Sequence, residues 1–167
     1  MAEKEEVFSS SIKYSGIFSF KDFYKFCYEW LKEETKVSLT EDKYEEKITG
    51  DKKNIEVEWS GKKKMTDYFR FDAGIKFSIK ELTNVEIIQN NAKIQTNKGD
   101  IKITCKGTLV RDYEGKFEVG AFQKFLRSIY EKWIIPSRIN QYEDKIISAC
   151  DGFLSQAKAY LDLEGKR

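Results

Sequence analysis

The sequence contains no histidine, and this absence excludes several kinds of catalytic and metal site at once. Neither a Ser-His-Asp nor a Cys-His nucleophile system forms without an imidazole, and zinc sites built on histidine are excluded for the same reason. No glycine-rich phosphate loop of the GxGxxG or GxxxxGK[ST] type occurs. We therefore expect a protein that is not an enzyme and that binds neither a metal ion nor a cofactor.

Cysteine is scarce, and proline occurs once. Cys27, Cys105 and Cys150 lie far apart, and no two of them form a CxxC pair. An odd number of widely spaced cysteines is not the pattern of a disulfide framework or of a thiolate zinc site. We expect three reduced, buried thiols.

Long hydrophobic runs and a strong charge of one sign are also missing. No apolar run approaches the roughly 18 residues that would span a membrane, and no apolar core of a signal peptide follows the charged first residues. We therefore expect a soluble, cytoplasmic protein. The net charge of +2 is far from the strongly basic balance that is typical of nucleic-acid binding. The lysine run 62–64, expected in a loop, would with Lys52 and Lys53 suit at most a weak contact with anionic lipid head groups.

Apolar residues make up 40% of the sequence, and their spacing predicts one domain over 1–167 with flexible ends at 1–6 and 164–167. Alternating apolar residues predict about seven strands, over 7–18, 37–48, 55–59, 69–79, 85–87, 92–96 and 101–109. The alternation is clearest over 69–79, which is typical of an antiparallel sheet with one face buried and one face in water. Gly74 and Gly107 are candidate bends or bulges in this sheet.

Helical periodicity appears in three places. The first helix is expected over 19–34, with Ser19 as its N-cap and Asp22 three residues later. A second is expected over 117–134, and Pro136 breaks or kinks the chain before a third helix that Ser137 can cap. The third helix carries an apolar stripe of Ile139, Tyr142, Ile146, Cys150, Phe153, Ala157 and Leu161. The order predicts an α+β fold, in which a curved antiparallel sheet packs on the long C-terminal helix.

This order of elements resembles the helix-grip fold of the START/Bet v1-like superfamily, in which a curved antiparallel sheet wraps a long C-terminal helix. The resemblance covers most of the chain and implies an apolar cavity between the sheet and the helix. The chain departs from the family in having one longer helix, 19–34, where the family has two short ones. A further departure is the additional helix over 117–134, which would plug the cavity or form a lid.

A second resemblance is carried by the stretches LVRDYE at 109–114, FLR at 125–127 and YEDK at 142–145. These stretches are similar to an uncharacterised family of small archaeal proteins. The resemblance implies an archaeal source and no particular activity.

The helix-grip resemblance and the strand phases together identify ten candidate cavity residues: Phe71, Ile75, Phe77, Ile103, Cys105, Leu109, Arg111, Tyr142, Ile146 and Phe153. Arg111 continues the inward phase at the end of its strand, where a cation would serve as a polar anchor at the mouth of an apolar pocket. The alternative is an exposed strand-end residue. We expect a non-enzymatic binding protein for a hydrophobic or amphipathic small molecule such as a lipid.

A different interpretation is a structural or interaction protein with a filled core. Such a protein would form homo-oligomers, most simply a homodimer, or bind a protein partner through its C-terminal helices. The contact would use the stripe on 117–134 and the near-heptad positions Ile139, Tyr142, Ile146 and Ala149.

An enzyme that uses carboxylates, lysine or tyrosine alone is less favoured. Carboxylate groups do occur close together in the sequence, at Asp42, Glu45 and Glu46 and at Asp112 and Glu114. Charged residues this common pair by chance on solvated surfaces, so these groups single out no site.

Overall fold

The alternating segments build one five-stranded antiparallel sheet. In the computed structural model, which describes residues 3–111, 120–129, 132 and 136–166, the strands are β1 (Glu3–Phe18), β2 (Ser38–Thr49), β3 (Lys52–Lys64), β4 (Phe69–Gln89) and β5 (Ala92–Arg111). Their order across the sheet is β1-β5-β4-β3-β2, and all neighbours run antiparallel. The first strand therefore pairs with the last, and β1 and β2 form the two edges of an open sheet.

The sheet has five strands where the sequence predicts about seven, because one of the expected reversals is absent from β4 and another from β5. The β4–β5 register shifts between Lys80 and Thr83, and Glu81 takes a positive φ of 55° there. This bulge lets β4 continue instead of turning. Residues 97–100 likewise stay within β5, so the hairpin reverses only at Asn90-Asn91, as predicted.

Three other boundaries differ from the predictions. Residues 3–6, expected to be flexible, begin β1 and pair with the last four residues of β5. Lys62–Lys64, expected in a loop, continue β3 beside β4. At the other end of the chain, the last helix extends to Gly165, into the range expected to be flexible.

Neither glycine expected at a bend carries a bulge in its own strand. Gly74 keeps an unshifted register with both β3 and β5. Near Gly107 the shift lies on the neighbouring strand, between Glu6 and Phe8 of β1.

The first helix begins where the sequence predicts. α1 (Phe20–Trp30) starts after Ser19, whose Oγ accepts a hydrogen bond of 3.4 Å from the Asp22 N–H, so the predicted N-cap is confirmed. A π-helical turn, η1 (Leu31–Thr35), continues the helix.

The two C-terminal helices differ more from the expected ranges. α2 (Ala121–Ile129) is shorter than the predicted 117–134, and the rest of that range, apart from Gly120 and Lys132, lies outside the described residues, as does the expected kink before Pro136. α3 (Pro136–Gly165) has proline in its first turn, where a missing N–H costs little. Ser137 therefore lies inside α3, whereas the sequence predicts it just before the helix. Among the helices of the described chain, none is both long and apolar enough to cross a membrane.

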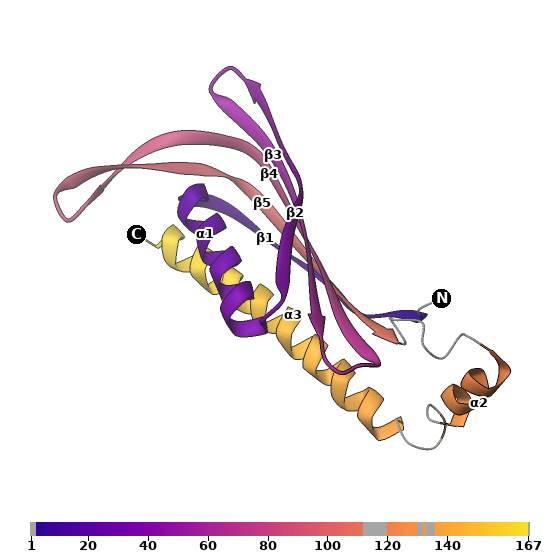
Figure 1. The fold of residues 1–167 in the computed structure, drawn as a ribbon. Coiled ribbons are helices and arrows are strands. Elements are labelled where there is room, and N and C mark those ends of the chain that lie inside the picture. Colours follow the sequence, from indigo (N-terminus) through magenta and orange to yellow (C-terminus); the bar gives the residue numbers. More distant parts are fainter. Residues whose placement is uncertain (1–2, 112–119, 130–131, 133–135, 167) are drawn as a thin grey trace.

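α1 and α3 lie on one face of the sheet, which arches over them (Figure 1). The two helices also contact each other, with the rings of Phe26 and Tyr160 stacked at 4.6 Å. The inward phase of the three central strands is buried, as predicted for a sheet with one covered face. Its buried residues are Ile55, Val57, Trp59, Phe69, Phe71, Ala73, Ile75, Phe77, Ile79, Ile101, Ile103, Cys105 and Leu109.

α3 lies very close to the sheet at Gly107 of β5. A Cβ atom at this position would stand 2.6 Å from Ile146 Cγ2 and 2.8 Å from Cys150 Sγ. Such distances are shorter than any ordinary van der Waals contact. Glycine at 107 is therefore what allows the helix to approach the sheet this closely.

Gly107→Ala is expected to lower the free energy of unfolding by about 1–3 kcal/mol, because the added methyl group overpacks the contact with α3. Denaturant unfolding followed by circular dichroism measures the change. The matched control is Gly74→Ala, since a Cβ at Gly74 would meet no atom within 4 Å. The control is expected to change stability by less than about 0.5 kcal/mol, and an equal loss in both variants would contradict the close approach at Gly107.

Candidate functional site

The structure gathers the predicted cavity residues in the layer between the sheet and α3. Eight of the ten are buried, and they are the apolar members of the set: Phe71, Ile75, Phe77, Ile103, Cys105, Leu109, Ile146 and Phe153. On the sheet they are direct cross-strand partners, since Phe77 lies opposite Ile103 and Phe71 lies opposite Leu109. Tyr142 is half-buried, with its ring 5.0 Å from that of Phe69.

Close contacts fill the middle of this layer. The thiol of Cys105 interacts with Cys150 on α3, and this interaction together with burial raises the pKa of Cys105 well above its ordinary value. Burial likewise raises the pKa of Cys27 on α1. All three cysteines are free and buried, as predicted. The raised pKa values make Cys27 and Cys105 poor nucleophiles at neutral pH.

Aromatic rings fill the layer beside α1. Phe77 lies under Trp59 at 4.8 Å and near Phe23 at 6.3 Å, both edge to face. Tyr24 contacts Trp59 at 5.0 Å and donates a hydrogen bond to Glu41. Burial and this hydrogen bond raise the pKa of Tyr24 to about 12, so the phenol stays protonated at neutral pH. It is therefore not poised as a base.

Arg111 is the last residue of β5 and continues the inward phase of that strand. Its guanidinium group forms an ion pair within the domain. Arg111 Nη2 lies 2.8 Å from Glu5 Oε2 on β1, and the side chain is 21% exposed. Its Nε is buried and has no hydrogen-bond partner within the described part of the chain. A buried donor without an acceptor is uncommon, so this atom is a place where a ligand acceptor would be stabilised.

Further charges continue from Arg111 onto the two C-terminal helices. Glu143 of α3 lies against Glu5, and Arg127 of α2 lies 2.9 Å from Glu3, the cross-strand partner of Arg111. We refer to Glu3, Glu5, Arg111, Arg127 and Glu143 as the end cluster. The sequence did not predict it, because the cluster depends on the pairing of the first strand with the last.

α2 exposes apolar side chains beside the end cluster. Phe122, Phe125 and Leu126 are 70%, 60% and 40% exposed. Their spacing of three and four residues places them on one face of the helix. Arg127, which ties α2 to Glu3, follows Leu126 by about 100° around the helix axis and so occupies a different face. The apolar face of α2 is thus left in solvent while the helix is held to the domain.

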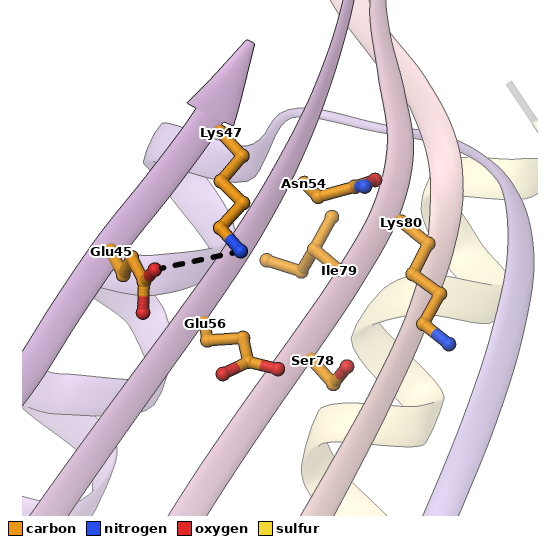
Figure 2. A pocket seen from close by; sticks show the side chains of 7 residues that line it. All are labelled: Glu45, Lys47, Asn54, Glu56, Ser78, Ile79 and Lys80. Carbon is orange, nitrogen blue, oxygen red and sulfur yellow. Dashed lines mark ion pairs between the residues drawn. The ribbon is translucent and has the colours of Figure 1, made fainter. Parts of the chain in front are cut away.

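Of the described helices none covers the opposite face of the sheet, and hollows lie on that face. One hollow of about 180 Å³ lies over β2, β3 and β4, and Figure 2 shows the side chains that line it, with the helices behind the strands. Lys43 lies 3.1 Å from Glu56 and 3.5 Å from Glu45, which lies in turn 4.0 Å from Lys47. The hydrogen bond between Lys43 and Glu56 lowers the pKa of the carboxyl group and raises that of the ammonium group. These charges satisfy one another in a surface network.

A second hollow, of about 420 Å³, lies over β1, β5 and β4. Three lysines, Lys13, Lys80 and Lys102, line it together with Ser15, Ser78 and Asp100, and Tyr14 and Ile101 complete its wall. The third hollow, of about 370 Å³, adjoins it and shares Ser15 and Asp100. Sequence reasoning missed these sites because their residues become neighbours only through the register of the strands.

Within the described ranges, the carboxylates considered for catalysis do not converge. Glu45 belongs to the network above, Glu46 accepts a hydrogen bond of 2.8 Å from Tyr44 Oη, and Asp42 is exposed. Asp112 and Glu114 lie outside the described residues. Across the described ranges, no group of three or more Cys, Asp or Glu side chains is placed to hold a metal ion.

Glu143→Gln is expected to raise the melting temperature at pH 7 by about 1–2 °C. Burial, and then the charge of Glu5, raise the pKa of Glu143. A carboxyl group with a raised folded-state pKa stabilises the fold fully below its unfolded pKa of about 4 and loses that contribution as the pH rises through the folded value. Thermal melting from pH 4 to 7 should therefore show the variant's advantage growing with pH. Asp151→Asn, an exposed site on α3, is the control, and an equal gain there would contradict the explanation.

Comparison with known proteins leaves the chain without a match. No protein-family model matches it, and neither a curated protein nor a solved structure does. Its function is therefore inferred from the positions of its own residues.

Proposed function

We propose that the chain is a non-enzymatic binding protein for a hydrophobic or amphipathic small molecule such as a lipid. We further propose that the ligand is bound where α2 lies beside the end cluster, and not under the middle of the sheet. The order of strands and helices, similar to the START/Bet v1-like helix-grip fold, favours binding of an apolar ligand. The close contacts at Gly107 and around Phe77 favour a location away from the middle.

The exposed apolar face of α2 is the observation that carries this proposal. Two phenylalanines and a leucine on one turn present apolar surface that a helix normally buries. Exposed apolar side chains that gather on one face, with polar residues at their rim, mark ligand or partner sites more often than scattered ones do. Phe122, Phe125 and Leu126 would therefore contact the apolar part of the ligand.

The end cluster would contact the polar part of the same ligand. Arg111 Nε is a buried donor without a partner in the described chain, and a carboxylate or hydroxyl oxygen would satisfy it. Glu5 and Glu143 beside it keep the net charge of the site low, which favours a head group of modest charge. An amphipathic molecule fits this combination better than a purely apolar one does.

A second candidate function is the binding of a protein partner or of another copy of the chain through α2. The exposed face of α2 supports it as well as it supports a small ligand. α3 does not add to it, because Ile146 is buried and Ile139, Tyr142 and Ala149 pack against the core. The near-heptad stripe predicted as an interface thus faces the sheet.

Titration with cis-parinaric acid, a naturally fluorescent fatty acid, tests the proposal. Phe122→Ala/Phe125→Ala is expected to weaken binding at least tenfold, since burial of one phenylalanine contributes about 1.5–3 kcal/mol and 1.4 kcal/mol corresponds to tenfold. The melting temperature should not change, because both side chains are exposed.

The control truncates two exposed apolar side chains elsewhere. Ile48→Ala/Ile88→Ala truncates two isoleucines near the hairpin ends that are 65% and 76% exposed, and it should leave binding unchanged. Equal losses in the two double variants, or no binding by the wild type, would refute a ligand site on α2. A wild-type dimer in light scattering that Phe122→Ala/Phe125→Ala converts to monomer, without fatty-acid binding, would favour the second candidate.

A further inference from the structure

We propose that the hollow over β1, β5 and β4 on the uncovered face of the sheet binds a small phosphate-bearing anion. We call this site the lysine hollow. Its polar lining consists of Lys13, Lys80, Lys102, Ser15, Ser78 and Asp100. The site lies on the face opposite the helices and is independent of the α2 surface.

Charge is distributed unevenly over the uncovered face. On the β2–β3 side, the carboxylates Glu45, Glu56 and Glu58 each have a lysine within 4.0 Å. On the β1–β5 side, neither Lys13 nor Lys102 has a carboxylate within that distance in the described chain. Lys80 has none either, although Asp100 is its cross-strand partner. Three lysines against one aspartate give the described lining of the hollow a net charge of +2.

The register places two of these lysines directly opposite each other. Lys13 of β1 pairs with Lys102 of β5, and Ser78 of β4 pairs with Lys102 on its other side. Like charges facing each other across antiparallel strands are destabilising by a few tenths of a kcal/mol or more. A bound anion would remove that repulsion, so the pair of lysines indicates a ligand site. Without the ligand, the same pair lowers the stability of the fold.

The shape and chemistry of the hollow favour a phosphate group on a small molecule. Its volume of about 420 Å³ lies in the range of small-molecule sites. Ammonium groups with the hydroxyls of Ser15 and Ser78 supply donors to phosphate oxygens. Tyr14 is the one aromatic residue in the described lining, and its ring packs edge to face on Phe18 while its hydroxyl donates to the Ile17 carbonyl oxygen. Single-stranded nucleic acid, which binds largely by stacking its bases on aromatic rings, is therefore not favoured.

Inorganic pyrophosphate is the probe, and binding is measured by thermal shift and by calorimetry at low ionic strength. The wild type is expected to melt at a higher temperature as pyrophosphate is added, because a ligand that binds only the folded state stabilises it. Lys13→Gln/Lys102→Gln is expected to bind at least tenfold more weakly. Without the probe, this variant should melt no lower than the wild type, since it lacks the lysine pair's repulsion.

Lys25→Gln/Lys93→Gln is the matched control. It removes the same charge from two exposed lysines, on α1 and near the β4–β5 turn, and should bind pyrophosphate as the wild type does. No shift in the wild type, or equal losses in the two double variants, would overturn the proposal.

Vesicles of phosphatidylglycerol distinguish a free phosphate compound from a lipid head group. The two glutamine substitutions at Lys13 and Lys102 should leave flotation with these vesicles unchanged. Flotation that depends on this pair, in a protein that does not bind pyrophosphate, would assign the lysines to a lipid surface and overturn the small-molecule proposal.

Discussion

The apolar side chains on the inward face of β4 and β5 are buried in the layer between the sheet and the helices α1 and α3, and the contact with α3 positions the rest of the fold. Gly107 lets the helix approach until Ile146 and Cys150 stand over the sheet backbone. Because protein interiors pack to the density of organic crystals, contacts this close leave little room for a guest molecule at Gly107. A ligand that entered there would have to separate the sheet from α3, and the free energy of that separation would weaken its binding.

The two proposed ligand surfaces lie outside that layer, and they differ in chemistry. The α2 face is apolar and lies beside a cluster of mixed charges, whereas the lysine hollow is polar, basic and set on the opposite side of the sheet. An apolar molecule has little to gain in the hollow, and a multiply charged anion has little to gain on α2. The α2 face and the lysine hollow would therefore bind different ligands, and a negative result at one site leaves the other unaffected.

Local patterns in the sequence predicted much of the fold. Alternation over 69–79 predicted the buried face, Ser19 predicted the start of α1, and Asn90-Asn91 predicted the hairpin turn. The stripe on α3 also identified the face that packs on the sheet. Each of these depends on residues close together in the chain, where side-chain chemistry and period decide the outcome.

Features that depend on the pairing of residues far apart in the sequence could not be predicted from local patterns. No local pattern in residues 3–6 predicts that they pair with β5. The positive φ at position 81, where two expected strands join into one, occurs at a glutamate and not at a glycine, so the sequence does not indicate it. The sequence left Arg111 either as an inward polar anchor or as an exposed strand-end residue, and its partner Glu5 was not predicted, because that contact depends on register. For the same reason, the juxtaposition of Lys13 with Lys102 could not be read from the sequence.

The reactivity of the three cysteines in the native protein tests the closed layer most directly. Cys27 reports on α1, and Cys105 and Cys150 report on the two sides of the contact between sheet and α3. With a small aromatic disulfide reagent at neutral pH, no thiol should react within minutes in the folded protein, and all three should react at once in denaturant. Rapid modification of Cys105 or Cys150 under native conditions would show open space between sheet and helix and would contradict the account.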